Sequence, residues 1–195
     1  MSAAPKPKLT AAEYLAIERA APYKSEFFGG EMFAMSGASP AHNRVKDNLI
    51  GALAAALRGT GCYTHSSDQR VRVDATGLYT YPDILILCGP GEFAADDPYT
   101  LLDPKVIIEV LSDSTRGYDR GAKARQYKRL PSLQEYVLVE QDEAVIDRYV
   151  RQPGGSWDAT TVEGLAAEFA FASVAARVPM ADVYAGVAFP ETPSR

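Results

Sequence analysis

Two acidic residues lie within segments that otherwise consist almost entirely of apolar residues. Asp83 follows Pro82 and opens the run 84–88, while Glu109 lies inside the run 105–111. A buried ionised carboxylate costs several kcal/mol unless it is paired or binds a metal. If the two runs are neighbouring strands, both carboxylates can ligate one hard divalent cation, a centre suited to phosphodiester hydrolysis.

The same two acids also permit an interpretation without any metal. Pro82 has no N–H and fits the first position of a strand, and Asp83 beside it can accept a hydrogen bond from a backbone N–H. Glu109 can form an ion pair with a lysine or an arginine. The segment 89–103 between the two runs is expected to be a loop with one helical turn, which can make the crossover between the strands.

A basic segment follows the second run. A start signal at 112–115 predicts a helix over 114–129. The basic residues of this helix are Arg116, Arg120, Lys123, Arg125, Lys128 and Arg129, and its acid is Asp119. Such a concentration of positive charge in an acidic chain suggests contacts to phosphates, the usual positioning contacts to nucleic acid.

One face of that helix combines Arg116, Asp119, Lys123 and Tyr127, which are spaced at i, i+3, i+7 and i+11. The functional interpretation is that Lys123 reaches the metal site, where it orients a water or stabilises charge on a phosphate. The alternative is an ordinary surface pair between Asp119 and Lys123, which contributes a few tenths of a kcal/mol.

Caps and periodicity predict the helices that must position these residues. Thr10 and Glu13 form a capping-box signature for a helix that ends near residue 20, and the Ser39-Pro40 pair opens a second helix. The second helix has an apolar stripe at four-residue steps, made of Val45, Leu49, Leu53 and Leu57. One face of that helix is therefore expected to cover a core.

Short strands are predicted on both sides of the second helix. Gly29-Gly30 marks a hairpin turn between strands at 25–28 and 31–35. In the strand at 69–73, alternation places the valines inward and Arg70 and Arg72 outward. The remaining predicted elements are strands at 62–65, 84–88, 106–111, 133–139, 144–149 and 157–162 and a short helix at 181–184. The fold class predicted is α/β (mixed α+β), with a central mixed β-sheet flanked by helices.

Composition limits the class of protein. The 195 residues, 47% of them hydrophobic, suit a single domain, expected over 9–185 with flexible ends at 1–8 and 186–195. The net charge of −5 argues against a uniformly basic nucleic-acid-binding surface but not against a local basic groove. Cys62 and Cys88 are expected to be reduced thiols in a cytoplasmic protein. No apolar leader and no run of about 18 apolar residues is visible, so neither secretion nor membrane insertion is expected.

The order of motifs along the chain resembles the Uma-type family, a bacterial group described as candidate restriction endonucleases of the PD-(D/E)xK nuclease superfamily. The resemblance covers about residues 9–185. It rests on Thr10 to Tyr14, Ser25-Glu26, Gly30-Glu31, Met35-Ser36-Gly37, His42, Tyr81-Pro82-Asp83, Pro104 to Glu109, Val110 to Thr115, Asp119, Lys123, Tyr127 and Glu135-Tyr136.

The resemblance implies a restriction-endonuclease-like core in which Asp83 and Glu109 hold Mg²⁺ or Mn²⁺, with the Val110 carbonyl as a further ligand. The superfamily pattern has a lysine two residues after the second acid, where this chain has Leu111. Lys123 on the following helix is the natural substitute, and a lysine in this shifted position is usual in the Uma-type family.

Two amino-terminal residues complete the predicted site. The resemblance suggests that Glu26 is a third carboxylate near the metal, and the alternative is a surface strand acid. His42 either binds a phosphate and tunes the site or makes a hydrogen bond at a helix end. Arg116, Arg120 and Tyr127 are expected, with His42, to contact nucleic acid.

These observations predict a Mg²⁺- or Mn²⁺-dependent endonuclease that hydrolyses DNA. One alternative is a nuclease fold that binds nucleic acid or a protein partner without cutting, and another is a structural protein whose acids are ion-paired. A homodimer is expected, formed through apolar residues of the late strands that are expected to be exposed, which are Val137, Val139, Val145 and Ile146.

Overall fold

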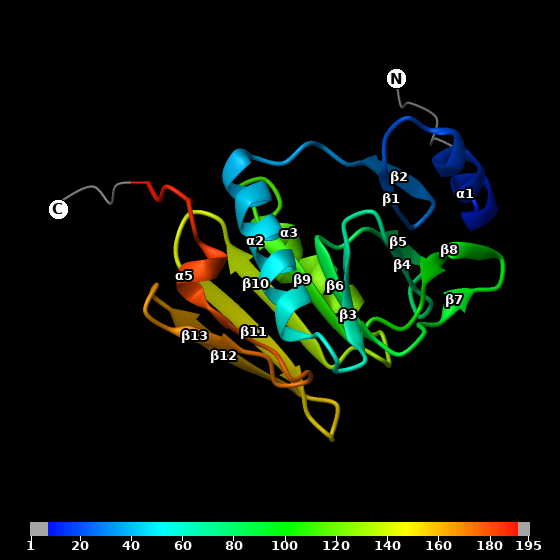
Figure 1. Cartoon of the computed structure of the whole chain (residues 1–195). Helices are drawn as coiled ribbons and strands as arrows, with labels where there is room; N and C mark the ends of the chain where they lie inside the picture. The colour runs from blue at the N-terminus through cyan, green and yellow to red at the C-terminus, as the bar shows by residue number, and fades with distance from the viewer. Residues whose placement is uncertain (1–7, 191–195) are drawn as a thin grey trace.

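The computed structural model describes residues 8–190, and most of the two ends predicted to be flexible lies outside them. The described residues form two six-stranded sheets and a two-stranded sheet, with helices packed against them (Figure 1). The helical elements are α1 (Ala11–Ala20), α2 (Pro40–Ala56), α3 (Arg116–Tyr118), the π-helix η1 (Asp119–Lys123), α4 (Ala124–Tyr127) and α5 (Met180–Val183). The predicted fold class, a mixed β-sheet flanked by helices, is confirmed.

One of the two six-stranded sheets, here called the central sheet, has the strand order β12-β11-β10-β9-β6-β3. Its strands are β3 (Cys62–Ser66), β6 (Ile84–Cys88), β9 (Val106–Leu111), β10 (Glu135–Glu140), β11 (Val145–Arg151) and β12 (Trp157–Glu163). Strands β9 and β10 are parallel, and all other neighbours in this sheet are antiparallel. The near-continuous apolar sequences of β6 and β9 follow from their central position, where both faces are covered.

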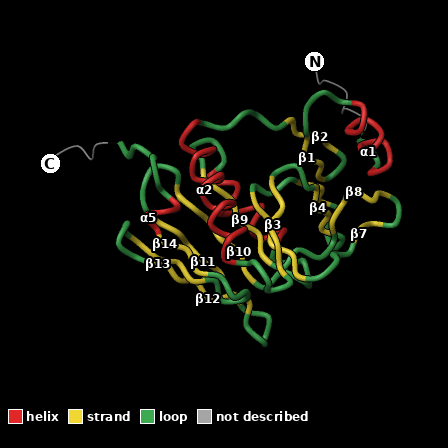
Figure 2. Tube along the Cα trace, in the orientation of Figure 1, coloured by secondary structure: helices red, strands yellow, loops and turns green. Residues whose placement is uncertain are grey.

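The second layer, here called the outer sheet, has the order β2-β1-β5-β4-β8-β7. Its strands are β1 (Ser25–Phe28), β2 (Glu31–Ala34), β4 (Arg70–Val73), β5 (Leu78–Thr80), β7 (Phe93–Ala94) and β8 (Asp97–Leu101). The two-stranded sheet pairs β13 (Glu168–Ala170) with β14 (Arg177–Pro179). Figure 2 shows the yellow strands of the outer sheet lying to the side of α2, beside α1.

Local signals determine where the first two helices begin. Thr10 and Glu13 form the predicted capping box, because the Thr10 side chain accepts from the Glu13 N–H and the Glu13 carboxylate accepts from the Thr10 N–H. Ser39 is the N-cap of α2, and its hydroxyl accepts from the His42 N–H at 3.0 Å. His42 is thereby fixed in the first turn of α2.

The central sheet buries a core on each of its faces. On one face, the apolar stripe of α2 packs with Ile84, Ile86 and Ile108. On the other face, Leu85 and Ile107 pack with residues of the segment α3–η1–α4 and of the outer sheet. The segment that carries Lys123 is therefore held against the face of the central sheet opposite to α2.

Several predicted elements differ from the structure. The segment 89–103 is not a loop with a helical turn but holds the β7–β8 hairpin, and β6 and β9 are antiparallel, so no crossover joins them. The helix expected over 114–129 is interrupted by the π-helix η1. Arg70 does not point outward but is buried, because it is paired with Asp97.

The apolar residues expected to form a dimer surface are mostly inside the protein. Val137, Val139 and Ile146 are fully buried in the core that α2 covers, and only Val145 is partly exposed. The prediction that these strands present an apolar face to a second copy is therefore wrong. The reason is that β13, β14 and α5 pack over them.

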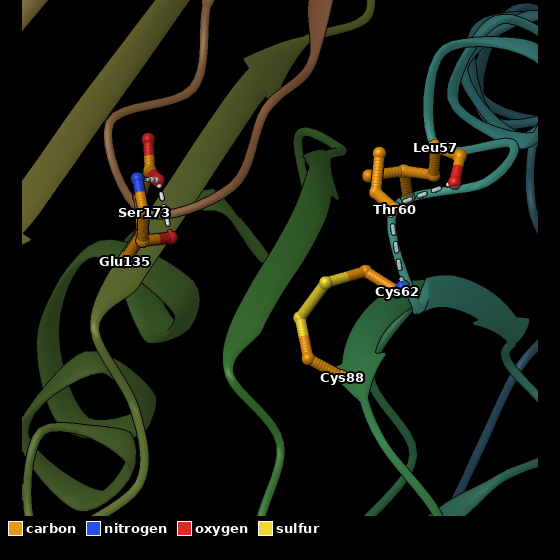
Figure 3. Close-up of a disulfide and its surroundings, with 6 residues drawn as sticks. All are labelled: Leu57, Thr60, Cys62, Cys88, Glu135 and Ser173. Carbon is orange, nitrogen blue, oxygen red and sulfur yellow. Dashed lines mark hydrogen bonds between the residues drawn. A yellow bond between two sulfur atoms is a disulfide. The ribbon is translucent and has the colours of Figure 1, made fainter.

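The two cysteines, expected to be free thiols, form the disulfide Cys62–Cys88 (Figure 3). Antiparallel pairing of β3 with β6 places them directly opposite each other. Thr60 bridges the end of α2 to this point, because its hydroxyl donates to the Leu57 carbonyl and accepts from the Cys62 N–H. The spacing of the two cysteines in the sequence does not predict this disulfide, because the disulfide depends on the register in which β3 and β6 pair.

The expected flexible tail is partly ordered. Val187 and Phe189 pack against the core beside α2, and the Phe189 ring lies 5.5 Å from that of Tyr184 between centroids. Within residues 8–190, no helix has both the length and the apolar character needed to cross a membrane.

Candidate active site

Antiparallel pairing of β6 with β9 brings the two predicted metal ligands together. Ile84 pairs with Ile108, so Asp83 and Glu109 stand opposite each other at the next position. The Asp83 N–H donates to Glu109 Oε2 at 3.1 Å, and the Val110 N–H donates to Asp83 Oδ2 at 2.9 Å. These cross-strand hydrogen bonds fix both carboxylates at the same end of the pair.

Lys123 reaches this pair from the helical segment. Its Nζ lies 2.9 Å from Glu109 Oε1, 3.1 Å from Glu26 Oε1 and 3.5 Å from Asp119 Oδ1. The side chain is only 7% exposed, so it is held in place and not free in solvent. The π-helix η1 ends at Lys123, and such wide turns are frequent at functional sites.

Glu26 connects the outer sheet to the site. Besides Lys123, its carboxylate accepts hydrogen bonds from Thr80 Oγ1 at 2.6 Å and from the Tyr118 hydroxyl at 3.2 Å. Sequence reasoning identified neither Thr80 nor Tyr118. Thr80 lies three residues before Asp83 and Tyr118 lies next to Asp119, but only the assembled fold shows that both contact Glu26.

His42 contacts Asp83 from the first turn of α2. Its Nε2 lies 3.1 Å from Asp83 Oδ2, and its Nδ1 is buried without a hydrogen-bond partner among residues 8–190. This position makes His42 a neighbour of the carboxylate pair. A helix-end hydrogen bond is also present, because the His42 backbone N–H donates to the hydroxyl of Ser39, the N-cap of α2.

The site holds more negative than positive charge. The carboxylates of Glu26, Glu109 and Asp119 contact the single ammonium of Lys123, and the carboxylate of Asp83 lies next to Glu109. Burial raises the pKa of Glu109 to about 8, and the charges of Asp83 and Asp119 add to this rise, although Lys123 opposes it. An acid that resists ionisation in this way marks a place where a further cation is favoured.

The pKa values of Asp83 and Lys123, which both contact Glu109, are shifted so that each group favours its charged form. Burial alone would raise the pKa of Asp83, but the hydrogen bond and charge of His42 and the Val110 N–H outweigh it and lower that pKa. Burial alone would lower the pKa of Lys123, but the charge of Glu109 and other neighbouring acids raises it well above its usual value. Lys123 and Asp83 are therefore both charged near neutral pH.

The donor set fits a hard divalent cation. A carboxylate oxygen has two lone pairs, so Glu109 Oε2, which accepts one N–H, keeps capacity for a metal. None of the described residues donates a hydrogen bond to the other oxygen of Asp83, Oδ1. Two carboxylates and the excess negative charge are what Mg²⁺ or Mn²⁺ requires.

A different acidic group has the closest spacing of carboxylates. Within the described part of the chain, Glu140, Asp142 and Glu143 are the one set of three whose oxygens all lie within 4.8 Å of one another. Arg116 contacts Glu140 and Asp142 at 3.0 Å, and Arg120 contacts Glu140 at 2.7 Å. The two arginines offset part of the negative charge of Glu140 and Asp142, and neither of them contacts Glu143.

The other residues expected to contact nucleic acid lie in different surroundings. Arg116 and Arg120 project toward the β10–β11 region, where Glu140, Asp142 and Asp147 pair with them. Tyr127 is fully buried and its hydroxyl donates to Glu109 Oε1 at 2.8 Å. A buried ring offers no surface to a ligand. Tyr127 therefore does not face nucleic acid, and its hydroxyl instead holds the Glu109 carboxylate in place.

Both metal-free roles considered for the acids are also present. Asp83 accepts the Val110 N–H and Glu109 is paired with Lys123. These contacts do not exclude metal binding, because each carboxylate keeps lone pairs after making them.

Comparison with known proteins places the chain in a family. A family model, Uma2, described as "Putative restriction endonuclease", matches residues 11–175. Two similar proteins from Synechocystis sp. strain PCC 6803 are both named as uncharacterised. The protein slr1290 is 37% identical over 154 residues, with 79% of this chain and 80% of slr1290 covered. The protein sll1609 is 35% identical over 163 residues, with 84% of this chain and 92% of sll1609 covered.

A solved structure shares the fold. The crystal structure of "a putative nuclease belonging to DUF820" from Anabaena variabilis superposes with a TM-score of 0.71 at 16% identity, covering 90% of this chain and 97% of that one. The family match extends over most of the chain and includes every predicted site residue from Glu26 to Tyr127. This chain is a member of the Uma2 family of restriction-endonuclease-like proteins.

Proposed function

We propose that this protein is a metal-dependent endonuclease that hydrolyses phosphodiester bonds of DNA. The observation that carries the proposal is the cross-strand placement of Asp83 opposite Glu109, with Lys123 2.9 Å from the second acid. Two acids and a lysine in this arrangement are the parts needed to bind a cation and to stabilise charge on a phosphate. Family membership supports the same reaction class.

Each residue has a proposed role. Asp83 and Glu109 hold the cation, for which Mg²⁺ is the first choice and Mn²⁺ the second. When bound, the cation supplies a water of lowered pKa and polarises the phosphate. Lys123 positions the attacking water and neutralises developing charge, and Glu26 holds the Lys123 ammonium in place. His42 orients Asp83 by its hydrogen bond to Oδ2.

The experiment is a cleavage assay with Mg²⁺ or Mn²⁺, comparing wild type with Asp83→Asn and Lys123→Met. Asn keeps an acceptor for the Val110 N–H, so the strand pair stays intact while a metal ligand is weakened. We expect each variant to lose at least about 100-fold in rate. Asp158→Asn, an exposed acid on β12, is the matched control and keeps full activity. Unchanged rates in both site variants contradict the proposal.

A second candidate function is binding without cleavage. The observation that favours it is that Glu109 already contacts Lys123, Tyr127 and the Asp83 N–H. It predicts nucleic-acid binding that weakens steeply with salt, and no cleavage with any divalent metal. Cleavage of DNA after addition of a divalent metal would rule out this second function.

Two further expectations belong to this proposal. A DNA substrate in the cell implies a cytoplasmic location, and there the pair Cys62 and Cys88 would meet reducing conditions. A homodimer stays a prediction, now without a designated surface. Light scattering on the purified protein measures the oligomeric state directly.

A further inference from the structure

One face of the β1–β2 hairpin presents exposed aromatic rings beside the site. Glu26 and Phe33 are directly opposite each other in the antiparallel pair, so their side chains project from the same face. Phe28 lies two residues after Glu26 and shares that face. Phe27 projects from the other face and packs under α1. The rings of Phe28 and Phe33 thus lie on the face from which Glu26 reaches Lys123.

Three rings gather around Glu26 and are open to solvent. Phe28 is 40% exposed, Phe33 is 50% exposed and Tyr118 is 40% exposed. The Tyr118 hydroxyl donates to Glu26 Oε2. Single exposed apolar residues are ordinary on a protein surface, whereas several on one face, beside the candidate site, are what a binding surface would present.

Two lysines contact Ser67, and one of them, Lys24, lies on the other side of Glu26 from Phe28 along the chain. Lys24 precedes β1 and shares the face of Glu26, and its Nζ lies 2.8 Å from the Ser67 carbonyl and from Asp68. Lys46 lies one helical turn after His42, and its Nζ reaches the Ser67 hydroxyl at 3.5 Å. The Asp68 side chain is 87% exposed, so its ion pair with Lys24 is weak and a phosphate can replace it.

From Lys24, just before β1, through Glu26 to Phe28, the chain therefore presents a cation, a carboxylate and an aromatic ring in that order. Proteins that bind single strands combine these two devices: cations that follow the backbone and aromatic rings that stack on unpaired bases. In a duplex the faces of the bases are already stacked on one another, so exposed aromatic rings of a protein contribute little to its binding.

We propose that the substrate of this site is single-stranded nucleic acid, with unpaired bases stacked on Phe28 and Phe33 and flanking phosphates at Lys24 and Lys46. This inference rests on the proposed function, because it specifies the substrate of that same site. The rings position the strand so that a phosphate lies over Asp83 and Glu109.

The test is binding measured by fluorescence anisotropy in EDTA, which prevents cleavage. The probes are a labelled oligothymidylate of about 20 nucleotides and a duplex of equal length. The proteins are wild type, the double variant Phe28→Ala/Phe33→Ala, the variant Phe33→Trp and the control Tyr99→Ala. Tyr99 is 71% exposed on β8, separated from β1 in the outer sheet by β5 and β4.

We expect wild type to bind the single strand more tightly than the duplex. The double variant should lose at least about fivefold in single-strand affinity, the loss of one stacked base. Phe33→Trp should keep the affinity and Tyr99→Ala should match wild type. An equal affinity of wild type for both probes overturns the inference, as does unchanged single-strand binding by a double variant with a wild-type melting temperature.

A cleavage assay separates this inference from the proposed function. If DNA is cut in an Asp83-dependent way while the double variant binds and cuts like wild type, the inference fails and the function stands. If binding depends on the two rings but no cleavage follows with Mg²⁺ or Mn²⁺, the proposed function fails and the binding surface stands.

Discussion

The buried carboxylate of Glu109 makes the candidate site sensitive to pH. Its pKa is raised to about 8 from a usual value of 4.5 because it is buried among other acids. For an acid with a raised folded-state pKa, the folded protein binds the proton more tightly than the unfolded chain does. The free energy of unfolding of the metal-free protein is therefore expected to fall as the pH rises from about 4.5 to about 8.

Replacement of this acid by its amide tests the argument at the residue scale. In Glu109→Gln the titrating group is absent, so the fall in the free energy of unfolding between pH 5 and pH 8 should become shallower than in wild type. Urea denaturation at the two pH values measures it. Asp158→Asn is the exposed control and should keep the wild-type slope. An equally steep fall in Glu109→Gln would show that another group is responsible.

The disulfide between β3 and β6 leads to a prediction at the scale of elements. It closes a loop between positions 26 residues apart, for which the loop-entropy model gives a stabilisation of about 3 kcal/mol. Dithiothreitol should lower the midpoint of urea denaturation of wild type and leave a Cys62→Ala/Cys88→Ala variant unchanged. Cleavage should persist after reduction, because Cys88 and Asp83 lie at opposite ends of β6. Loss of activity on reduction would show instead that the disulfide holds the site.

Elements with local signals were predictable from sequence, and elements that depend on pairing were not. The helix starts at Thr10 and Ser39 follow from side chains that cap their own backbone. The β7–β8 hairpin was missed because Asp97 and Pro98 look like loop residues, and Asp97 becomes part of a strand through its contact with Arg70. The π-helix also escaped prediction, since nothing in its composition distinguishes it from an α-helix.

The candidate site was predictable to a similar extent. The apolar runs around Asp83 and Glu109 selected the two acids, and the helix face together with the family resemblance selected Lys123. Whether these residues act in catalysis stays a prediction. The contacts of Glu26 with Thr80 and Tyr118 need the outer sheet to be placed against the helical segment. Sequence periodicity carries no information on the docking of two layers.

At the scale of the whole molecule, a buried polar network joins α1 to the outer sheet. The Asp97 carboxylate is fully buried and pairs with Arg70 and Arg19. Tyr81, two residues before Asp83, donates to Glu18 of α1 and accepts from Arg70. The network therefore connects α1 and the outer sheet to the segment just before β6, which carries Asp83.

Removal of the negative charge of Asp97, at the centre of this network, should destabilise the whole fold. Burial alone raises the pKa of Asp97, but hydrogen bonds from Thr100, Arg70 and Arg19 outweigh it and lower the pKa to about 2. The stabilisation is thus complete above the usual value of 3.8 and is lost as the pH falls toward 2. Asp97→Asn leaves Arg70 buried without its partner and should lower the free energy of unfolding at pH 7 by about 3 kcal/mol or more.

Urea denaturation measured from pH 7 down to pH 2.5 checks this expectation. The difference between wild type and Asp97→Asn should narrow below about pH 4. The neighbouring Asp96→Asn is a matched control, because the Asp96 side chain is 65% exposed and its pair with Arg72 is solvated. A difference that is small at pH 7, or constant over the whole range, would contradict this role of Asp97.

The position of Lys123 on a helix also changes how related sequences should be compared. Leu111 occupies the strand position of the superfamily lysine and is fully buried in the core. Lys123 and the two proposed metal ligands, Asp83 and Glu109, therefore belong to separate elements, which can diverge independently during evolution. A relative that keeps both acids but lacks the helix lysine would retain the architecture while losing the proposed chemistry. If Lys123 has the proposed role, position 123, more than position 111, is the one whose residue should distinguish relatives that cleave nucleic acid from relatives that do not.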